Sequence, residues 1–145
     1  MFNADLARFI DAQRPVYDDA LAELRAGRKA SHWMWFVFPQ IAGLGSSFMA
    51  RHYAIRSAAE ARAFLAHPVL GPRLRACTEA LLQHEDGSAE TMLGGIDATK
   101  LRSSMTLFEA VSAGEDAQLF GLCLDRFFAG VRDPLTLRLL APSPD

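Results

Sequence analysis

The chain has 145 residues, of which 50% are hydrophobic and 22% are charged, and its formal net charge is -2. This composition excludes a disordered polymer, because disordered chains carry too few apolar residues to form a core. The absence of a basic excess argues against general nucleic-acid binding. The length is close to that of one domain. We therefore expect residues 1–145 to form one compact domain, with a loose C-terminal tail from about residue 141.

The first elements are two helices and a buried aromatic segment. Apolar residues recur every three or four positions before and after Pro15, and this spacing predicts two helices, the second ending at Gly27. Residues 33–38 are six apolar residues in a row and contain both tryptophans. No second strand-like run exists to pair with them, so we predict a short helix that Pro39 helps to end. Residues 43–47 are predicted to form a loop.

Helical spacing continues through the rest of the chain, with Gly and Pro between the segments. Ser57 followed by Glu60 predicts a capping box at the start of one helix. Asp97 is predicted to cap a later helix, and Asp133 followed by Pro134 is typical of the start of the last one. The prediction is an all-α fold, a single compact domain of about seven to eight helices with short loops.

The sequence lacks the patterns expected of a membrane span, a secretory signal and a metal site. No apolar run approaches the ~20 residues of a membrane span, and no basic segment followed by an apolar core begins the chain. We expect a cytoplasmic protein with no membrane partner. Cys77 and Cys123 are far apart and predict two buried thiols. The four histidines are separated by 15 to 20 residues and predict no metal site.

Four segments in order identify a family resemblance: SHWMWFVFPQ at 31–40, GLG at 43–45, HPVLG at 67–71 and DATKLRSSMTLF at 97–108. Together they resemble the bacterial family called domain of unknown function 1810, from Asp5 to about Leu140. The resemblance implies a small, all-helical, single-domain protein, and it implies no reaction, cofactor or catalytic residue. Some members carry the label calpastatin, but that inhibitor is a disordered polar chain whereas this one is half hydrophobic.

The first candidate site surrounds the aromatic segment. Trp33 and Trp35 carry flat indoles that stack on planar ligands, and Gln40 follows them closely. His32 is an acid or base near neutral pH. The structural alternative places the tryptophans in the core, with His32 and Gln40 satisfying backbone groups.

The second candidate site lies in the segment 97–108. Helical spacing puts Lys100, Ser103 and Ser104 along one side, and a lysine beside hydroxyls binds phosphate or carboxylate. Arg51 joins them if the loop at 43–47 folds back. A nucleophilic serine with a lysine base has the order Ser-x-x-Lys, which is reversed here. The alternative is structural: a solvated Lys100, with the serines packed between helices.

Three functions follow from these residues. The leading hypothesis is a domain that binds a small anionic or nucleotide-like ligand. The second is a hydrolase acting on a nucleotide or ADP-ribose-like derivative, with His32 or Asp97 as acid–base catalyst. The third is a protein-interaction module without catalysis, in which Leu137–Leu140 contact a partner or a second copy. The sequence identifies no cofactor and no oligomeric state.

Overall fold

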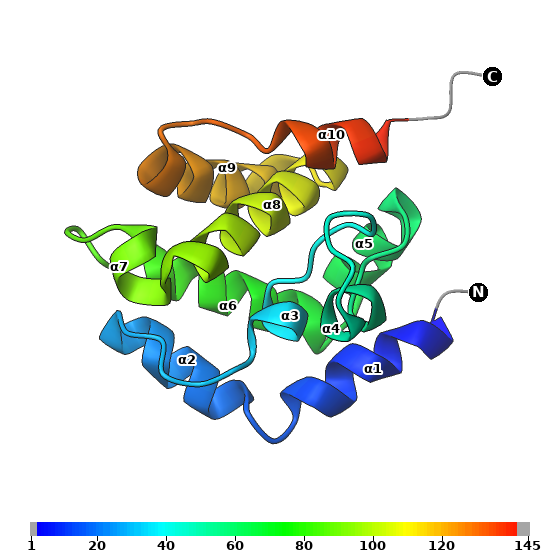
Figure 1. Cartoon of the computed structure of the whole chain (residues 1–145), viewed down its shortest axis with the longest axis horizontal. Coiled ribbons are helices and arrows are strands. Elements are labelled where there is room, and N and C mark those ends of the chain that lie inside the picture. Colours follow the sequence, from blue (N-terminus) through cyan, green and yellow to red (C-terminus); the bar gives the residue numbers. More distant parts are fainter. Residues whose placement is uncertain (1–2, 142–145) are drawn as a thin grey trace.

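A computed structural model describes residues 3–141, and these residues form ten helices and no β-strand (Figure 1). The helices are α1 (Asn3–Gln13), α2 (Tyr17–Ala26), α3 (Met34–Val37), α4 (Phe48–His52), α5 (Ala58–Ala66), α6 (Leu70–Leu82), α7 (Ala89–Leu93), α8 (Gly95–Val111), α9 (Gly114–Phe128) and α10 (Pro134–Leu140). The all-α fold is confirmed. The helix number exceeds the expected seven to eight, and three of the ten helices, α3, α4 and α7, have only four or five residues each.

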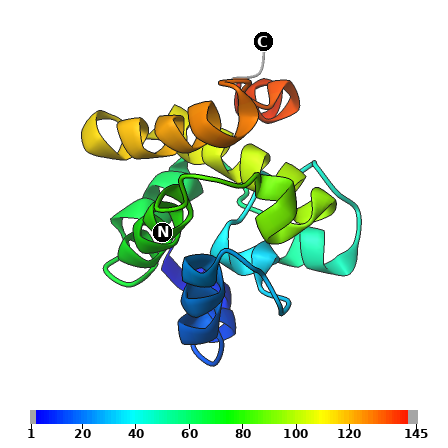
Figure 2. The ribbon, with the colours of Figure 1, turned by 90° about the vertical axis from the view of Figure 1, so that its left-hand side faces the viewer.

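Helix α8 is the central element of the domain. It packs against α5, α7, α9 and α10, while α6 contacts α2, α5 and α9. Figures 1 and 2 show α9 and α10 on one side of α8, with α1 and α2 on the opposite side of the molecule. This arrangement leaves the first turns of α8 beside the short helices α3 and α4.

A column of aromatic rings joins four helices through the core. Phe64 of α5 contacts Phe9 of α1 edge-on, with ring centroids 5.2 Å apart, and Phe108 of α8 at 5.4 Å. Phe108 in turn contacts Phe120 of α9 at 6.0 Å. All four side chains are fully buried, and each aromatic pair contributes beyond the area that it buries. The column fixes α8 against both halves of the domain.

Several helix ends agree with the sequence predictions. Gly27 ends α2 in the left-handed conformation, with φ of 74°. The Asp133 side chain accepts a hydrogen bond from the Thr136 amide, and Pro134 begins α10. Ser57 caps α5 by accepting from the Glu60 amide, but the Glu60 carboxylate accepts from the backbone amide of Arg56 instead of closing the reciprocal bond.

The prediction that Asp97 caps a helix is wrong. Helix α8 begins two residues earlier, at Gly95, and its N-cap residue is Gly94. Asp97 lies in the first helical turn, where a carboxylate still interacts favourably with the positive end of the helix dipole. Its side chain is consequently available to pair with lysines.

The structure also bears on membranes, metals and thiols. Within residues 3–141, no helix has the length and apolar character needed to span a membrane. The same residues contain no cluster of three His, Cys, Asp or Glu side chains arranged to hold a metal ion. Cys77 and Cys123 are buried free thiols, as predicted. The expected loose tail lies outside the described residues, apart from Ala141.

Candidate functional site

A cleft of about 510 Å³ lies between the α3–α4 loop, α4 and the first turns of α8. This volume falls within the roughly 300–1,000 Å³ of typical small-molecule sites. Its walls combine apolar side chains with polar groups: Trp35, Gln40, Ile41, Leu44, Gly45, Ser46, Ser47, Ala50, Ile96, Thr99 and Lys100. Two stretches far apart in the sequence, 35–50 and 96–100, therefore supply one concave surface.

Lys100 stands over the indole of Trp35 on the cleft wall. Its Nζ lies 3.6 Å from the Trp35 ring centroid, a favourable cation–π distance. The same ammonium donates to Oδ1 of Asp97 at 3.2 Å. Asp97 and Lys100 are three residues apart on α8, which places them on one side of the helix. Lys100 is thus held in a defined position at the cleft.

A second lysine reaches Asp97 from the α2–α3 connection. Nζ of Lys29 lies 2.8 Å from Oδ2 of Asp97, and both side chains are largely buried. Burial alone would raise the pKa of Asp97, but the two lysines outweigh it and hold this pKa below its usual value. Asp97 is therefore ionised at neutral pH. The group of Lys29, Asp97 and Lys100 carries one net positive charge beside the cleft.

The segment that carries Lys29 is fixed by Glu23 of α2. The Glu23 carboxylate accepts hydrogen bonds from the backbone amides of Ala30 and Ser31, from the Ser31 hydroxyl and from Nε1 of Trp33. Burial works to raise the pKa of Glu23, but these hydrogen bonds lower it to about 2. Sequence reasoning missed Glu23 and Lys29, because the bonds they form have no periodic spacing that would indicate them.

The sequence of residues 3–140 matches the family model described as Protein of unknown function (DUF1810). The chain belongs to this family. The chain is also similar to a solved structure, that of the conserved hypothetical protein Rv1873 from Mycobacterium tuberculosis. The two are 49% identical, the TM-score is 0.92, and the match covers 96% of this chain and 98% of that chain. No functionally curated protein matches the chain.

The fold brings three of the predicted site residues together. Trp35, Gln40 and Lys100 all line the cleft. Trp33 does not, because its side chain is fully buried and its Nε1 is bonded to Glu23. His32 is exposed and is not part of the cleft wall.

Arg51 and Asp97 lie near the cleft without lining it. Arg51 is exposed on α4, one residue after Ala50, which does line the cleft. Asp97 stands behind Lys100 and contacts it directly. Its carboxylate therefore acts on the cleft through the position of the lysine.

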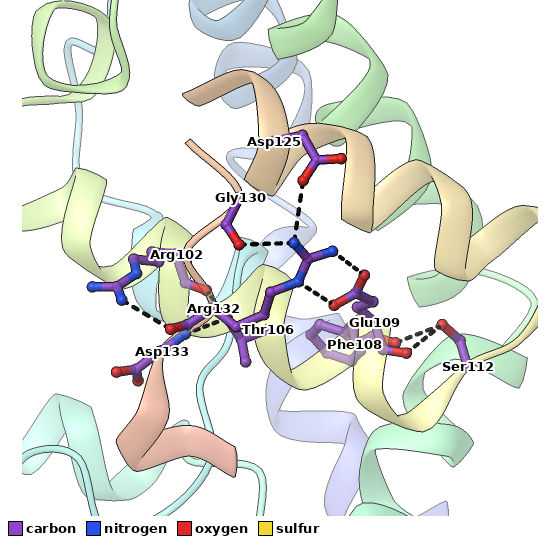
Figure 3. Close-up of polar contacts among 9 residues, drawn as sticks. All are labelled: Arg102, Thr106, Phe108, Glu109, Ser112, Asp125, Gly130, Arg132 and Asp133. Atoms are coloured by element: carbon purple, nitrogen blue, oxygen red, sulfur yellow. Dashed lines mark hydrogen bonds and ion pairs between the residues drawn. The ribbon is translucent and has the colours of Figure 1, made fainter. Parts of the chain in front are cut away.

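The two predicted serines lie elsewhere on α8. Ser103 is buried and donates to Oδ2 of Asp133 at 3.0 Å. Ser104 is fully buried, and its hydroxyl is without a hydrogen-bond partner in the described part of the chain. The Asp133 amide donates to the Thr106 hydroxyl at 3.0 Å, as Figure 3 shows. This face of α8 thus holds the segment before α10.

A second hollow of about 480 Å³ borders α8 and α9. Three charged residues of its lining, Glu109, Asp125 and Arg132, form ion pairs with one another. Arg132 donates to both carboxylate oxygens of Glu109, to Asp125 and to the carbonyl of Gly130 (Figure 3). These bonds, the pair with Glu109 foremost, raise the pKa of Arg132 far above its usual value despite some desolvation. The guanidinium is therefore occupied in joining α8 to the α9–α10 connection. The Trp35–Lys100 cleft is the better candidate site.

Proposed function

We propose that this protein binds a small anionic, nucleotide-like ligand in the cleft beside Trp35 and Lys100. The observation that carries this proposal is the ammonium of Lys100, held on the cleft wall against an indole. A cation in this position offers an anionic group a partner next to an aromatic surface.

Charge supports an anionic ligand. Lys29 and Lys100 both pair with the single carboxylate of Asp97, so one positive charge remains in excess. The side chain of Lys100 is only 16% exposed, so its charge is less screened by solvent than that of a surface lysine. An ammonium has three donors, and the bond to Asp97 uses one of them. A phosphate or carboxylate oxygen would engage the others.

The apolar walls support a planar group on the same ligand. Ile41, Leu44 and Ile96 line the cleft together with Trp35. Small-molecule sites are commonly built in this way, from apolar and aromatic side chains with a few polar groups that fix orientation. A nucleotide combines a flat base with a phosphate and matches both parts of the cleft.

Binding without hydrolysis is the version of this function that the geometry favours. A general acid must hold a proton near neutral pH. The pKa of Asp97 is instead lowered by Lys29 and Lys100, and neither Asp97 nor His32 lines the cleft. A protein-interaction module is less favoured too. Leu135, Leu137 and Leu139 of α10 are exposed, but Leu137 lies on the opposite side of the helix from the other two, so the three do not form one apolar surface.

Tryptophan fluorescence during titration tests the proposal. AMP, ADP and ADP-ribose are added to the wild-type protein and to Lys100→Gln, with Arg51→Gln as the matched control on neighbouring α4. At least one nucleotide is expected to bind saturably. Lys100→Gln should weaken this binding roughly tenfold or more, because a hydrogen bond to a charged group is lost, whereas Arg51→Gln should leave it within about twofold.

Trp35→Phe identifies the source of the signal. The fluorescence change should disappear in this variant, since the remaining Trp33 is fully buried away from the cleft. The proposal fails if none of the three nucleotides binds at millimolar concentration, or if Arg51→Gln weakens binding as much as Lys100→Gln.

A further inference from the structure

Among the described residues, Gln40 and Ser46 are the polar side chains of the cleft wall that form no hydrogen bond, and Gln40 is the more buried of the two. It is half-buried and lines the cleft, yet its amide forms no hydrogen bond with any residue in the range 3–141. Ser47 and Thr99 of the wall are engaged: Ser47 accepts from the Ala50 amide, and Thr99 donates to the Gly95 carbonyl. Lys100 is bonded to Asp97.

Gln13 is a glutamine with a structural role and can be compared with Gln40. Its Nε2 donates to the Phe36 carbonyl at 2.7 Å, and its Oε1 accepts from Arg73 at 3.4 Å. Both ends of that buried amide are satisfied. The amide of Gln40 has neither bond and borders a cavity, so its donor and its acceptor are both available to a ligand.

The backbone of Gln40 is rigidly placed although its side chain has no partner. Its carbonyl accepts from the Ile55 amide at 2.8 Å, and the Ala42 amide donates to the Ile55 carbonyl at 2.8 Å. These bonds form a parallel bridge between Ile41 and Ile55, and both side chains are buried. A side chain that starts from a fixed backbone loses less entropy when it binds a ligand.

We propose that Gln40 determines the specificity of the cleft by binding the edge of a nucleobase that presents a hydrogen-bond donor next to an acceptor. Lys100 binds the anionic group of the same ligand, so this inference rests on the function proposed above. A carboxamide has one donor and one acceptor side by side and pairs with such an edge through two hydrogen bonds. Ligands of this class are nucleoside monophosphates with an amino or imino donor on the base.

The test compares nucleotides whose bases present different hydrogen-bonding edges. The probes are AMP, GMP, CMP and UMP, together with purine riboside 5′-monophosphate, whose base has ring acceptors but no donor. In the wild-type protein at least one of the four common nucleotides should bind roughly tenfold more tightly than purine riboside 5′-monophosphate. Gln40→Met, which keeps the length of the side chain and removes both hydrogen bonds, should reduce that ratio below about twofold.

Two controls separate this inference from the proposed function. Gln118→Met makes the same change on α9, beside the second hollow, and should keep the wild-type ratio. Lys100→Gln should weaken all five probes while leaving their ratio unchanged, because it removes the contact that they share. Gln40→Glu replaces the donor with a second acceptor and should weaken the binding of every base edge that pairs one donor with one acceptor. Circular dichroism confirms that each variant folds.

Each outcome decides between the two ideas. If Gln40→Met keeps the wild-type ratio, or if the wild-type protein does not discriminate, the role of Gln40 is refuted, while Lys100-dependent binding would still support the cleft. If no probe binds in a Lys100-dependent manner, the proposed function and this inference both fail.

Discussion

Replacing Glu23 with glutamine is expected to lower the free energy of unfolding by about 2 kcal/mol at pH 7. The Glu23 carboxylate accepts four hydrogen bonds, two from backbone amides and two from the side chains of Ser31 and Trp33. A glutamine side chain keeps only one oxygen, and its NH2 group would face donors. The connection between α2 and α3 would therefore lose its main anchor.

The magnitude follows from the pKa of Glu23. The gap between its ordinary value of 4.5 and the folded value of about 2 corresponds to about 3 kcal/mol, at 1.36 kcal/mol per pKa unit. The side chain is only partly buried, and solvent screening reduces the effect to about 2 kcal/mol. For a domain of this size, such a loss lowers Tm by roughly 4–8 °C.

The pH dependence has a definite sign. Because folding lowers the pKa of Glu23, the stabilisation is complete above about pH 4.5 and is lost as the pH falls toward 2. The difference between the wild-type protein and Glu23→Gln should consequently be constant from pH 7 to pH 5.5 and smaller at pH 3. Urea unfolding followed by circular dichroism at these pH values measures it.

Glu85→Gln is the matched control for Glu23→Gln. Glu85 is exposed, and its side chain accepts no hydrogen bond from residues 3–141. Its replacement should change the free energy of unfolding by less than about 0.5 kcal/mol. The reasoning is refuted if both variants lose the same stability at pH 7, or if the loss in Glu23→Gln is as large at pH 3 as at pH 7.

Three further predictions concern the core and the helix ends. Gly71→Ala should destabilise the protein by about 3 kcal/mol in urea unfolding, because its Cβ would lie 2.1 Å from the Leu65 carbonyl oxygen. Asp133→Ala should cost about 2 kcal/mol in the same assay, since the cap of α10 is lost. Burial raises the pKa values of Cys77 and Cys123 to about 12, so neither thiol should react with iodoacetamide at pH 8 until the protein unfolds.

These predictions have equally direct controls. Gly95→Ala introduces the same methyl group where nothing lies within 4 Å and should be nearly neutral; an equal loss in both glycine variants would contradict the clash at Gly71. Ser57→Ala removes a comparable cap from α5. An Asp133→Ala variant as stable as the wild-type protein would refute the role of the Asp133 cap of α10. Rapid alkylation of the folded protein would contradict the assignment of both cysteines to the core.

The sequence by itself determined the local features of this protein. Helical spacing, the glycine that ends α2 and the Asp-Pro pair that begins α10 act over a few residues, so they are visible before any contact is known. The aromatic run at 33–38 was expected to be buried because of its area, and five of its six residues are, with Trp35 half-buried. Four ordered segments were enough to indicate the family, which the match over residues 3–140 confirms.

The tertiary structure alone decided which residues share the cleft. Sequence spacing could not distinguish Trp33, which is bonded to Glu23 in the core, from Trp35, which meets Lys100 at the cleft. It also placed Ser103 beside Lys100, although the fold turns that serine toward the segment before α10. Periodicity assigns a residue to a side of its own helix, but only packing between distant segments decides what that side faces. The cleft and its charge therefore arise from contacts that no local pattern encodes.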